Sequence, residues 1–309
     1  MKPPTDPRRA RFLRQSLGLA AALALPGTAL AQSSASDKPR MKTRTIPSTG
    51  EALPVVGCGT WVGFDVPDEG PAIGALAGVV DALFAAGGSV LDSSPMYGRS
   101  EAVTGRLLAA RPRNAFVATK VWIGGRAAGI EQMQQSMRLL GKVDLLQGHN
   151  LLDWKTQLPT MRQWKAEGRI RYVGVTHYTP GAYRELEAVL RAETLDFVQV
   201  NYALDDREGE QRILPLAADR GIAVLVNRPF GGGGLLKRLS AEPLPAWATE
   251  IGAATWSQLL LKFVLSHPAV TCAIPGTGNP RHMAANAAAG IGDPPDRAFW
   301  NGRIDALVR

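Results

Sequence analysis

From residue 54 onward the chain alternates short apolar runs with longer amphipathic stretches. The apolar runs are rich in Val, Ile and Leu without strict alternation, which is typical of parallel strands buried on both faces. They predict strands at residues 54–60, 88–92, 114–120, 143–148, 170–175, 195–201, 222–227 and 270–274. The stretches between and after them predict helices at residues 70–86, 100–110, 129–140, 155–167, 180–191, 209–220, 252–266 and 280–289. Each predicted strand is thus followed by a helix.

Repeated strand–helix units favour an α/β fold of the closed (β/α)8 type, the TIM barrel, over an open sheet. An open sheet that binds a dinucleotide would carry Gly-x-Gly-x-x-Gly after its first strand, and that motif does not follow residues 54–60. Pro, Ser, Thr and Gly at positions 47–50 lie between two short extended pieces and predict an N-terminal β-hairpin that caps the bottom of the barrel. Residues 294–307 predict a C-terminal helix.

The first 31 residues follow a different pattern. Four arginines between positions 8 and 14 precede an apolar stretch at residues 17–25, and Ala29-Leu30-Ala31 ends the segment. Charged, apolar and small-residue regions in this order are typical of an export signal. The apolar stretch is shorter than the about 20 residues that span a bilayer. We therefore expect residues 1–31 to be a signal peptide cleaved near Ala31, and the mature protein to be periplasmic or secreted without stable membrane association.

The pair Arg8-Arg9, followed by Phe12-Leu13, resembles a twin-arginine signal, with Phe one residue further from the pair than usual. The twin-arginine route carries folded proteins, so that a cofactor could be bound before export. The general secretory machinery is the alternative partner. Residues 32–43 have the composition of a flexible linker. Residues 44–309 form the expected barrel domain.

The net charge of +8 is concentrated at the N-terminus. Residues 1–31 hold five Lys or Arg against one Asp, a net +4, which leaves +4 for the rest of the chain. No block of Lys and Arg is interleaved with aromatic residues, so a nucleic-acid partner is not expected. The two cysteines, Cys58 and Cys272, each lie in an apolar run. They predict buried free thiols and neither a disulfide framework nor a metal site.

Polar residues follow three consecutive predicted strands. Asp92 ends the second strand, with Tyr97 five residues later; Lys120 ends the third and His149 follows the fourth. Because the C-terminal ends of barrel strands form one rim, we expect these side chains to lie together. Reduction of a carbonyl by hydride requires a proton donor. We expect Lys120 to lower the pKa of Tyr97 toward a useful range, Asp92 to hold Lys120, and His149 to orient the substrate oxygen.

Residues 91–98, with Ser100-Glu101 and Gly105 after them, resemble the signature of the aldo-keto reductase family. That family pairs the signature with a Lys after the next strand, here in residues 118–122, and a His after strand four, here in residues 144–149. The resemblance extends over about residues 44–290. It implies a monomeric, NAD(P)H-dependent oxidoreductase that reduces aldehydes or ketones, with a catalytic tetrad in which the general acid is a Tyr. The tetrad residues are Tyr97, Lys120, Asp92 and His149.

The resemblance also implies which residues contact the cofactor. They are Gly59, Thr60, Trp61, Thr176, His177, Gln199, Pro229, Phe230, Gly231, Pro275, Gly276, Thr277, Arg281 and Asn286. The chain departs from the family at several of these places: Thr176-His177 replaces the common Ser-Asn pair, and Asn227 stands where an aromatic residue often stacks on nicotinamide. Arg281 still favours NADP(H) over NAD(H), because a later Arg commonly binds the 2′-phosphate.

Trp61 and Trp122 are expected to form an apolar substrate wall with Tyr97, next to His149. Two other functions remain open. Lys120 could form a Schiff base in an aldolase, which borohydride trapping would reveal. Alternatively, the chain could be an exported nucleotide-binding protein with little or no catalytic role, since reduced nicotinamide is not freely regenerated outside the cytoplasm.

Overall fold

The computed structural model describes residues 40–67, 69–111 and 115–308. The expected export signal, with its twin arginines, and most of the linker lie outside these residues. The described part starts with an antiparallel hairpin of β1 (Thr43–Thr45) and β2 (Ala52–Pro54), as predicted. Met41, expected in the linker, is buried and pairs with Ile291, so the folded part begins before residue 44.

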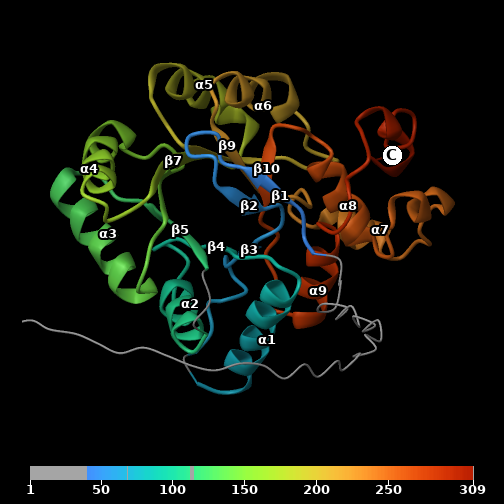
Figure 1. The fold of residues 1–309 in the computed structure, drawn as a ribbon, viewed down its shortest axis with the longest axis horizontal. Helices are drawn as coiled ribbons and strands as arrows, with labels where there is room; N and C mark the ends of the chain where they lie inside the picture. The colour runs from blue at the N-terminus through green and yellow to red at the C-terminus, as the bar shows by residue number, and fades with distance from the viewer. Residues whose placement is uncertain (1–39, 68, 112–114, 309) are drawn as a thin grey trace, which may run out of the picture. The chain divides into compact units, whose positions relative to one another are not determined.

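Eight parallel strands form one sheet in which each strand pairs with the next along the chain. The strands are β3 (Cys58–Gly59), β4 (Val90–Asp92), β5 (Phe116–Val121), β6 (Leu145–His149), β7 (Tyr172–Thr176), β8 (Phe197–Asn201), β9 (Ala223–Asn227) and β10 (Val270–Ala273). Helices surround the sheet (Figure 1). Those that follow the strands are α1 (Pro71–Ala85), α2 (Ser100–Ala109), α3 (Arg126–Leu140), α4 (Trp154–Ala166), α5 (Tyr183–Ala192), α6 (Gly209–Asp219), α8 (Trp256–Leu265) and α9 (Pro280–Ala288). The predicted (β/α)8 barrel is confirmed.

Backbone hydrogen bonds between the first and last strands close the barrel. Gly57 N donates to Ala273 O at 2.8 Å, and Ala273 N donates to Val55 O at 2.9 Å. We call this junction the seam. A Cβ on Gly59 would lie 2.9 Å from Ile274 O, so only glycine lets the first and last strands approach this closely. The regular part of the first strand, β3, is two residues long. The apolar run had predicted a longer strand, at residues 54–60.

Two apolar clusters lie on the two sides of the sheet. The larger one fills the space between the strands and the helices. The smaller one fills the barrel interior, where the rings of Phe116, Tyr172 and Phe197 lie with centroids 5.3–5.8 Å apart. Ile46 and Leu53 of the hairpin join this inner cluster. The barrel is thus packed rather than hollow, and chemistry is confined to its ends.

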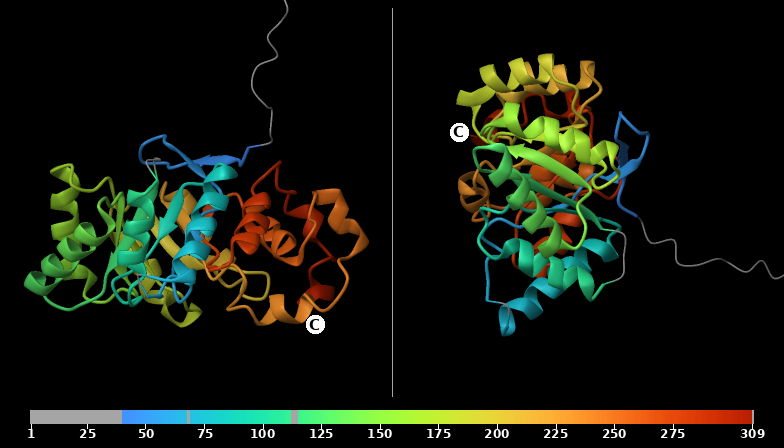
Figure 2. Two further views of the ribbon diagram at one scale, coloured as in Figure 1. Left: turned by 90° about the horizontal axis from the view of Figure 1, so that it is seen from below. Right: turned by 90° about the vertical axis from the view of Figure 1, so that its left-hand side faces the viewer.

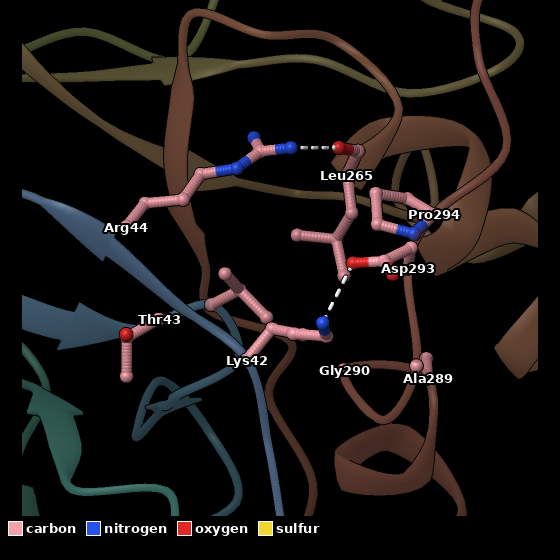
Figure 3. A pocket seen from close by; sticks show the side chains of 10 residues that line it. Lys42, Thr43, Arg44, Leu265, Ala289, Gly290, Asp293 and Pro294 are labelled. Atoms are coloured by element: carbon pink, nitrogen blue, oxygen red, sulfur yellow. Dashed lines mark hydrogen bonds and ion pairs between the residues drawn. The ribbon is translucent and has the colours of Figure 1, made fainter.

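The hairpin closes the end at which the strands begin (Figure 2). Thr49 contacts the hydroxyl of Tyr172, the first residue of β7, at 3.0 Å. Arg44 donates to Leu265 O and to His267 O at the end of α8, at 2.5 and 2.9 Å. Lys42, which pairs with Asp293 at 2.7 Å, and Arg44 line a cavity of about 190 Å³ (Figure 3). None of the predicted site residues lines it.

The segments around α8 and the C-terminus differ from the predicted pattern. Before α8 lie a short helix, α7 (Gly234–Leu239), and a 3-10 turn, η2 (Ala246–Ile251), so α8 is shorter than the predicted helix 252–266. The predicted helix 294–307 is reduced to a 3-10 turn, η3 (Ala298–Trp300), and a four-residue helix, α10 (Asp305–Val308). Gly302, with a φ of 73°, separates the two. Trp300 nevertheless anchors this tail, because its side chain is buried.

Candidate active site

The four tetrad residues lie at the C-terminal ends of three neighbouring strands. Asp92 ends β4, Lys120 is the next-to-last residue of β5, and His149 ends β6. Tyr97 lies in the turn between β4 and α2. Because the hairpin covers the opposite end, these residues share the open rim of the barrel. The structure therefore brings together all four residues that the sequence predicted to meet.

A buried ion pair forms the base of the site. Lys120 Nζ donates to Asp92 Oδ2 at 2.6 Å and to Ser93 O at 2.7 Å. Asp92 Oδ1 accepts from the side-chain amides of Gln147 at 3.2 Å and Gln199 at 2.9 Å. Both oxygens of the carboxylate thus have partners. A buried pair whose members are also hydrogen-bonded holds its geometry, whereas removal of one partner leaves an uncompensated charge.

Lys120 stays charged despite complete burial. Burial opposes the ammonium, but Asp92 and Tyr97 outweigh that effect and raise the pKa of Lys120 above its ordinary value. A Schiff-base nucleophile must be a neutral amine. The ion pair with Asp92 therefore argues against an aldolase that uses Lys120.

The pKa of Tyr97 is raised above its ordinary value, because burial of the phenol outweighs the opposing effect of Lys120. The Lys120 ammonium lies 5.2 Å from the centroid of the Tyr97 ring, and the charge of Asp92 works against ionisation of the phenol. The expectation of a net lowering was wrong, since it left out the burial of the ring. Tyr97 keeps its proton across the physiological range.

His149 is a neutral imidazole. Burial, assisted by the positive charges of Lys120 and His177, lowers the pKa of His149 to about 2. Ser94 Oγ lies 3.0 Å from Nδ1 of His149. A hydroxyl that donates to Nδ1 places the imidazole proton on Nε2, where it can donate to a substrate oxygen. The Tyr97 ring meets His149 edge-on, with centroids 5.9 Å apart.

Ser94 and Gln147 were missed by the sequence reasoning. Gln147 lies two residues before His149 on the same strand, and side chains two apart on a strand share a face. That spacing could have placed it beside the tetrad. Ser94 lies in a turn, where spacing gives no direction, so only the structure reveals its contact with His149.

Large apolar side chains are exposed on the loops of the rim that carries the tetrad. Most of those exposed in the described chain lie in loops that follow strand ends: Trp61, Val62, Met96, Trp122, Ile123, Leu152 and Tyr178. We call this set the apolar collar. The ring of Trp122 lies 6.2 Å from that of His149. The predicted wall residues Trp61 and Trp122 thus belong to a wider exposed apolar set, and such sets mark ligand sites.

A polar group lies beside the tetrad at the ends of β7–β9. Asn227 Nδ2 donates to His177 O at 3.2 Å and to Gln199 Oε1 at 3.5 Å, while its buried Oδ1 has no partner in the part of the chain that the structure describes. His177 Nδ1 accepts from Tyr178 N at 3.0 Å, which leaves Nε2 free to donate. Thr176 is buried at the end of β7. Amide and imidazole groups of this kind suit the donors and acceptors of a carboxamide. The amide nitrogen of Gln199, however, already serves Asp92.

Two predicted cofactor residues at the end of the first strand, Gly59 and Thr60, have structural contacts. The hydroxyl of Thr60 donates to Asp92 O at 3.1 Å and to Ser93 Oγ at 2.9 Å, and it is fully buried. Gly59 permits the close approach to Ile274. Their contacts with a cofactor remain predictions.

The remaining predicted cofactor residues lie in the loops after the last two strands. Pro229 is buried, Phe230 packs against the core, and Gly231 has a φ of 60°. After β10 come Pro275, Gly276 and Thr277.

Helix α9, which follows Thr277, starts with an exposed cation. Asn279 Oδ1 accepts from Arg281 N at 2.9 Å and caps the helix. Arg281 is exposed, whereas Asn286 on the same helix is buried. A capped helix N-terminus with an Arg suits an anionic group.

No cluster of three or more potential metal ligands occurs among the described residues. None of the described helices has the length and apolar content needed to cross a bilayer. Cys58 and Cys272 are free and buried, and burial raises the pKa of Cys58 to about 12.

Comparison with known proteins identifies the family of this chain. A model of the aldo/keto reductase family matches residues 56–294, and the chain belongs to that family. The aldo-keto reductase str7 of Strobilurus tenacellus is 27% identical over 252 residues, which are 68% of this chain and 75% of that protein. The NADH-specific methylglyoxal reductase of Escherichia coli is 28% identical over 195 residues, 52% of this chain and 58% of that protein. This chain thus spans little more than half of the latter relative.

Solved structures cover more of the fold. An aldo-keto reductase from Klebsiella pneumoniae, in complex with NADPH, superposes with a TM-score of 0.71 at 25% identity. The match covers 87% of this chain and 95% of that one.

Proposed function

We propose that this chain is an NAD(P)H-dependent oxidoreductase that reduces aldehyde or ketone carbonyls to alcohols, with Tyr97 as the general acid. The observation that carries the proposal is the open barrel rim, where a protonated phenol, a buried ammonium and a neutral imidazole lie together inside the apolar collar. Membership of the aldo/keto reductase family supports the reaction class.

Each tetrad residue has one task in this reaction. His149 donates from Nε2 to the carbonyl oxygen and orients it. Tyr97 gives its proton to that oxygen as negative charge develops there. Lys120 stabilises the phenolate that remains, because its ammonium lies against the ring and stays charged. Asp92 holds Lys120 in place and takes no direct part.

A nicotinamide dinucleotide, when bound, supplies the hydride. The polar group of Thr176, His177, Gln199 and Asn227 fits the carboxamide, and the exposed Arg281 at the start of α9 fits an adenosine phosphate. We propose NADP(H) over NAD(H) on the strength of Arg281. The Klebsiella relative binds NADPH, but the Escherichia coli relative is NADH-specific, so the choice depends on this contact.

The substitution Tyr97→Phe tests the proposed acid. It removes the proton donor and keeps the ring, so we expect kcat for aldehyde reduction to fall by at least about 100-fold. The dissociation constant of the nucleotide should change little. Loss of absorbance of NADPH measures turnover, and quenching of tryptophan fluorescence measures binding. Near-normal turnover in the variant would remove Tyr97 from this role.

The same measurements separate an enzyme from a nucleotide-binding protein. Tight binding of NADPH without reduction of any aldehyde or ketone in a broad panel would favour the second function. The hydrogen-bonded ion pair of Asp92 and Lys120 favours the first, because a protein that only binds nucleotide has no use for a buried charge pair beneath a phenol.

A further inference from the structure

Arg228 has an unusual backbone conformation. It follows β9, and its φ is 47°, in the left-handed region. A residue with a side chain costs about 1–2 kcal/mol in this conformation, and such costs concentrate at functional sites. The side chain is exposed, so packing in the core does not explain why the backbone adopts it.

The guanidinium of Arg228 has no ionic partner among the described residues. Its one recorded contact is with the ring of Tyr178, 5.7 Å from the centroid. Tyr178 in turn stacks on His177, with centroids 5.7 Å apart and an angle of 9° between the rings. Arg297, by comparison, pairs with Glu210 and donates to Tyr202. The five N–H donors of Arg228 thus remain available to a ligand.

The glycine loop at residues 231–234 lies against this guanidinium. A Cβ on Gly232 would come within 2.7 Å of Arg228 Nη2, so a side chain at this position would displace the cation. Gly231 N donates to Arg228 O at 2.9 Å, which folds the loop back onto Arg228. The φ values of Gly231, Gly232 and Gly233 are 60°, 93° and 94°. Bare backbone at Gly232 and the guanidinium of Arg228 therefore form one continuous surface, with the carboxylate of Asp205 against the neighbouring Gly231.

The place of this surface in the barrel indicates its ligand. The loop follows β9, the seventh barrel strand, and leads into the short helix α7. In (β/α)8 barrels, phosphate groups commonly bind between the loops after strands seven and eight and a short extra helix. Asn227, the neighbour of Arg228, belongs to the polar group assigned to the carboxamide. In a dinucleotide whose carboxamide is bound at Asn227, the pyrophosphate follows the nicotinamide and its ribose and precedes the adenosine.

We propose that Arg228 binds the pyrophosphate of the nicotinamide dinucleotide. The inference rests on the proposed function, since it requires that such a dinucleotide binds at this rim. A pyrophosphate carries two negative charges, and the planar guanidinium can donate to it through two parallel hydrogen bonds. Asn227 stands where an aromatic residue often stacks on nicotinamide, and the loss of that ring lowers cofactor affinity. The contact of Arg228 with the pyrophosphate would restore part of this affinity.

The substitution Arg228→Asn tests the proposal, because Asn tolerates the left-handed backbone and removes only the charge and its reach. Isothermal titration calorimetry with NADPH, NADH and ADP-ribose measures binding without any reaction. All three contain the adenosine, the pyrophosphate and the second ribose, and they differ in the nicotinamide and in the 2′-phosphate. We expect Arg228→Asn to weaken each by a similar factor, about 10- to 100-fold, as the loss of a charge-assisted contact predicts. Arg228→Lys should recover part of the loss.

Two further variants serve as controls. Arg281→Ala should weaken NADPH about 10-fold or more relative to NADH and ADP-ribose, because it removes a contact to the 2′-phosphate. Arg138→Ala removes an exposed cation of α3 whose side chain is hydrogen-bonded to Gln135, and it should change none of the three. Similar melting temperatures across the set would show that the fold is kept.

Three results would overturn the proposal. Loss of NADPH affinity alone in Arg228→Asn would move the contact to the 2′-phosphate. Unchanged affinities for all three ligands, with a raised KM for 4-carboxybenzaldehyde but not for benzaldehyde, would assign Arg228 to an acidic substrate. Unchanged affinities and unchanged KM values would leave it without a ligand role. The proposed function fails separately, namely if the unaltered protein binds neither NADPH nor NADH.

Discussion

At the scale of single residues, burial sets the protonation of the proposed catalytic groups. It raises the pKa of Tyr97 even though Lys120 lies beside the ring, and it lowers the pKa of His149 to about 2. The phenol therefore gives up its proton only to a strongly basic acceptor such as a developing alkoxide. This arrangement protects the resting enzyme from losing the proton to solvent before hydride transfer.

The buried, neutral His149 also links stability to pH. Its pKa is about 2 in the folded chain, against about 6.5 when unfolded, so below the latter value the unfolded chain binds a proton that the folded chain does not. Stability is then lost as the pH falls. The loss from His149 amounts to about 2 kcal/mol at pH 5. We expect His149→Gln to reduce, by about that amount, the drop in unfolding free energy between pH 7 and pH 5.

Urea unfolding at the two pH values measures this drop. The variant need not match the original protein at pH 7, because only the difference between the two pH values is compared. His282→Gln is the control, since His282 lies exposed on α9. An equal pH dependence for the original protein and for His149→Gln would show that His149 is not held neutral by burial.

The identity of the tetrad could be predicted from the sequence, but its electrostatics could not. Asp92, Lys120 and His149 each lie at or next to the end of a recognisable strand, and the segment around Tyr97 carries the family signature. The direction of the Tyr97 shift depends on how the loops pack over its ring, which no local pattern records. The contact between Ser94 and His149 depends on a turn in the same way.

At the scale of elements, the pattern of apolar runs predicted the strand order and most helices. It overestimated the first strand, because the seam is made by backbone approach at Gly57 and Gly59 rather than by apolar side chains. It also missed α7, a helix of six residues that is too short to show a helical period. The C-terminal tail is held by the burial of Trp300, a tertiary contact that hydrophobic periodicity does not report.

Replacement of glycine by alanine should change the stability of the chain in opposite directions at the seam and in a helix. A Cβ at Gly59 would press on a backbone oxygen at 2.9 Å, so we expect Gly59→Ala to destabilise the chain by about 1–3 kcal/mol. Gly74 lies in α1 with no atom near its Cβ position, and Gly74→Ala should stabilise the chain by about 0.5–1 kcal/mol. Urea unfolding measures both. Changes of the same sign would show that close approach at the seam is not what selects Gly59.

At the scale of the whole molecule, the two ends of the barrel have separate tasks. The hairpin closes the end at which the strands begin, and the cavity beside Arg44 lies next to it. The tetrad with its apolar collar occupies the other end. The described chain enters at the hairpin end, where Met41 pairs with Ile291. The contacts described for the tetrad are all made by residues that follow this point.

This separation bears on the proposed export of the protein. We propose that residues 1–31 direct it out of the cytoplasm by the twin-arginine route, because Arg8 and Arg9 precede an apolar stretch interrupted by Gly18 and several alanines. Nicotinamide cofactors are made in the cytoplasm, and a ligand that binds only the folded state stabilises that state by mass action. Export in the folded form would let the enzyme leave with its nucleotide bound, whereas threading as an unfolded chain would strip it.

The double substitution Arg8→Lys and Arg9→Lys tests this route, because it preserves the charge and changes only the arginine pair. We expect the precursor to remain in the cytoplasm, folded, uncleaved and active. Cell fractionation followed by mass spectrometry of the intact chain would locate it and report cleavage near Ala31. The matched control is Arg11→Lys with Arg14→Lys, which should still be exported. If the Arg8 and Arg9 variant reaches the periplasm and is trimmed as before, export of the folded, loaded protein is excluded, and the barrel would need another source of reduced nucleotide.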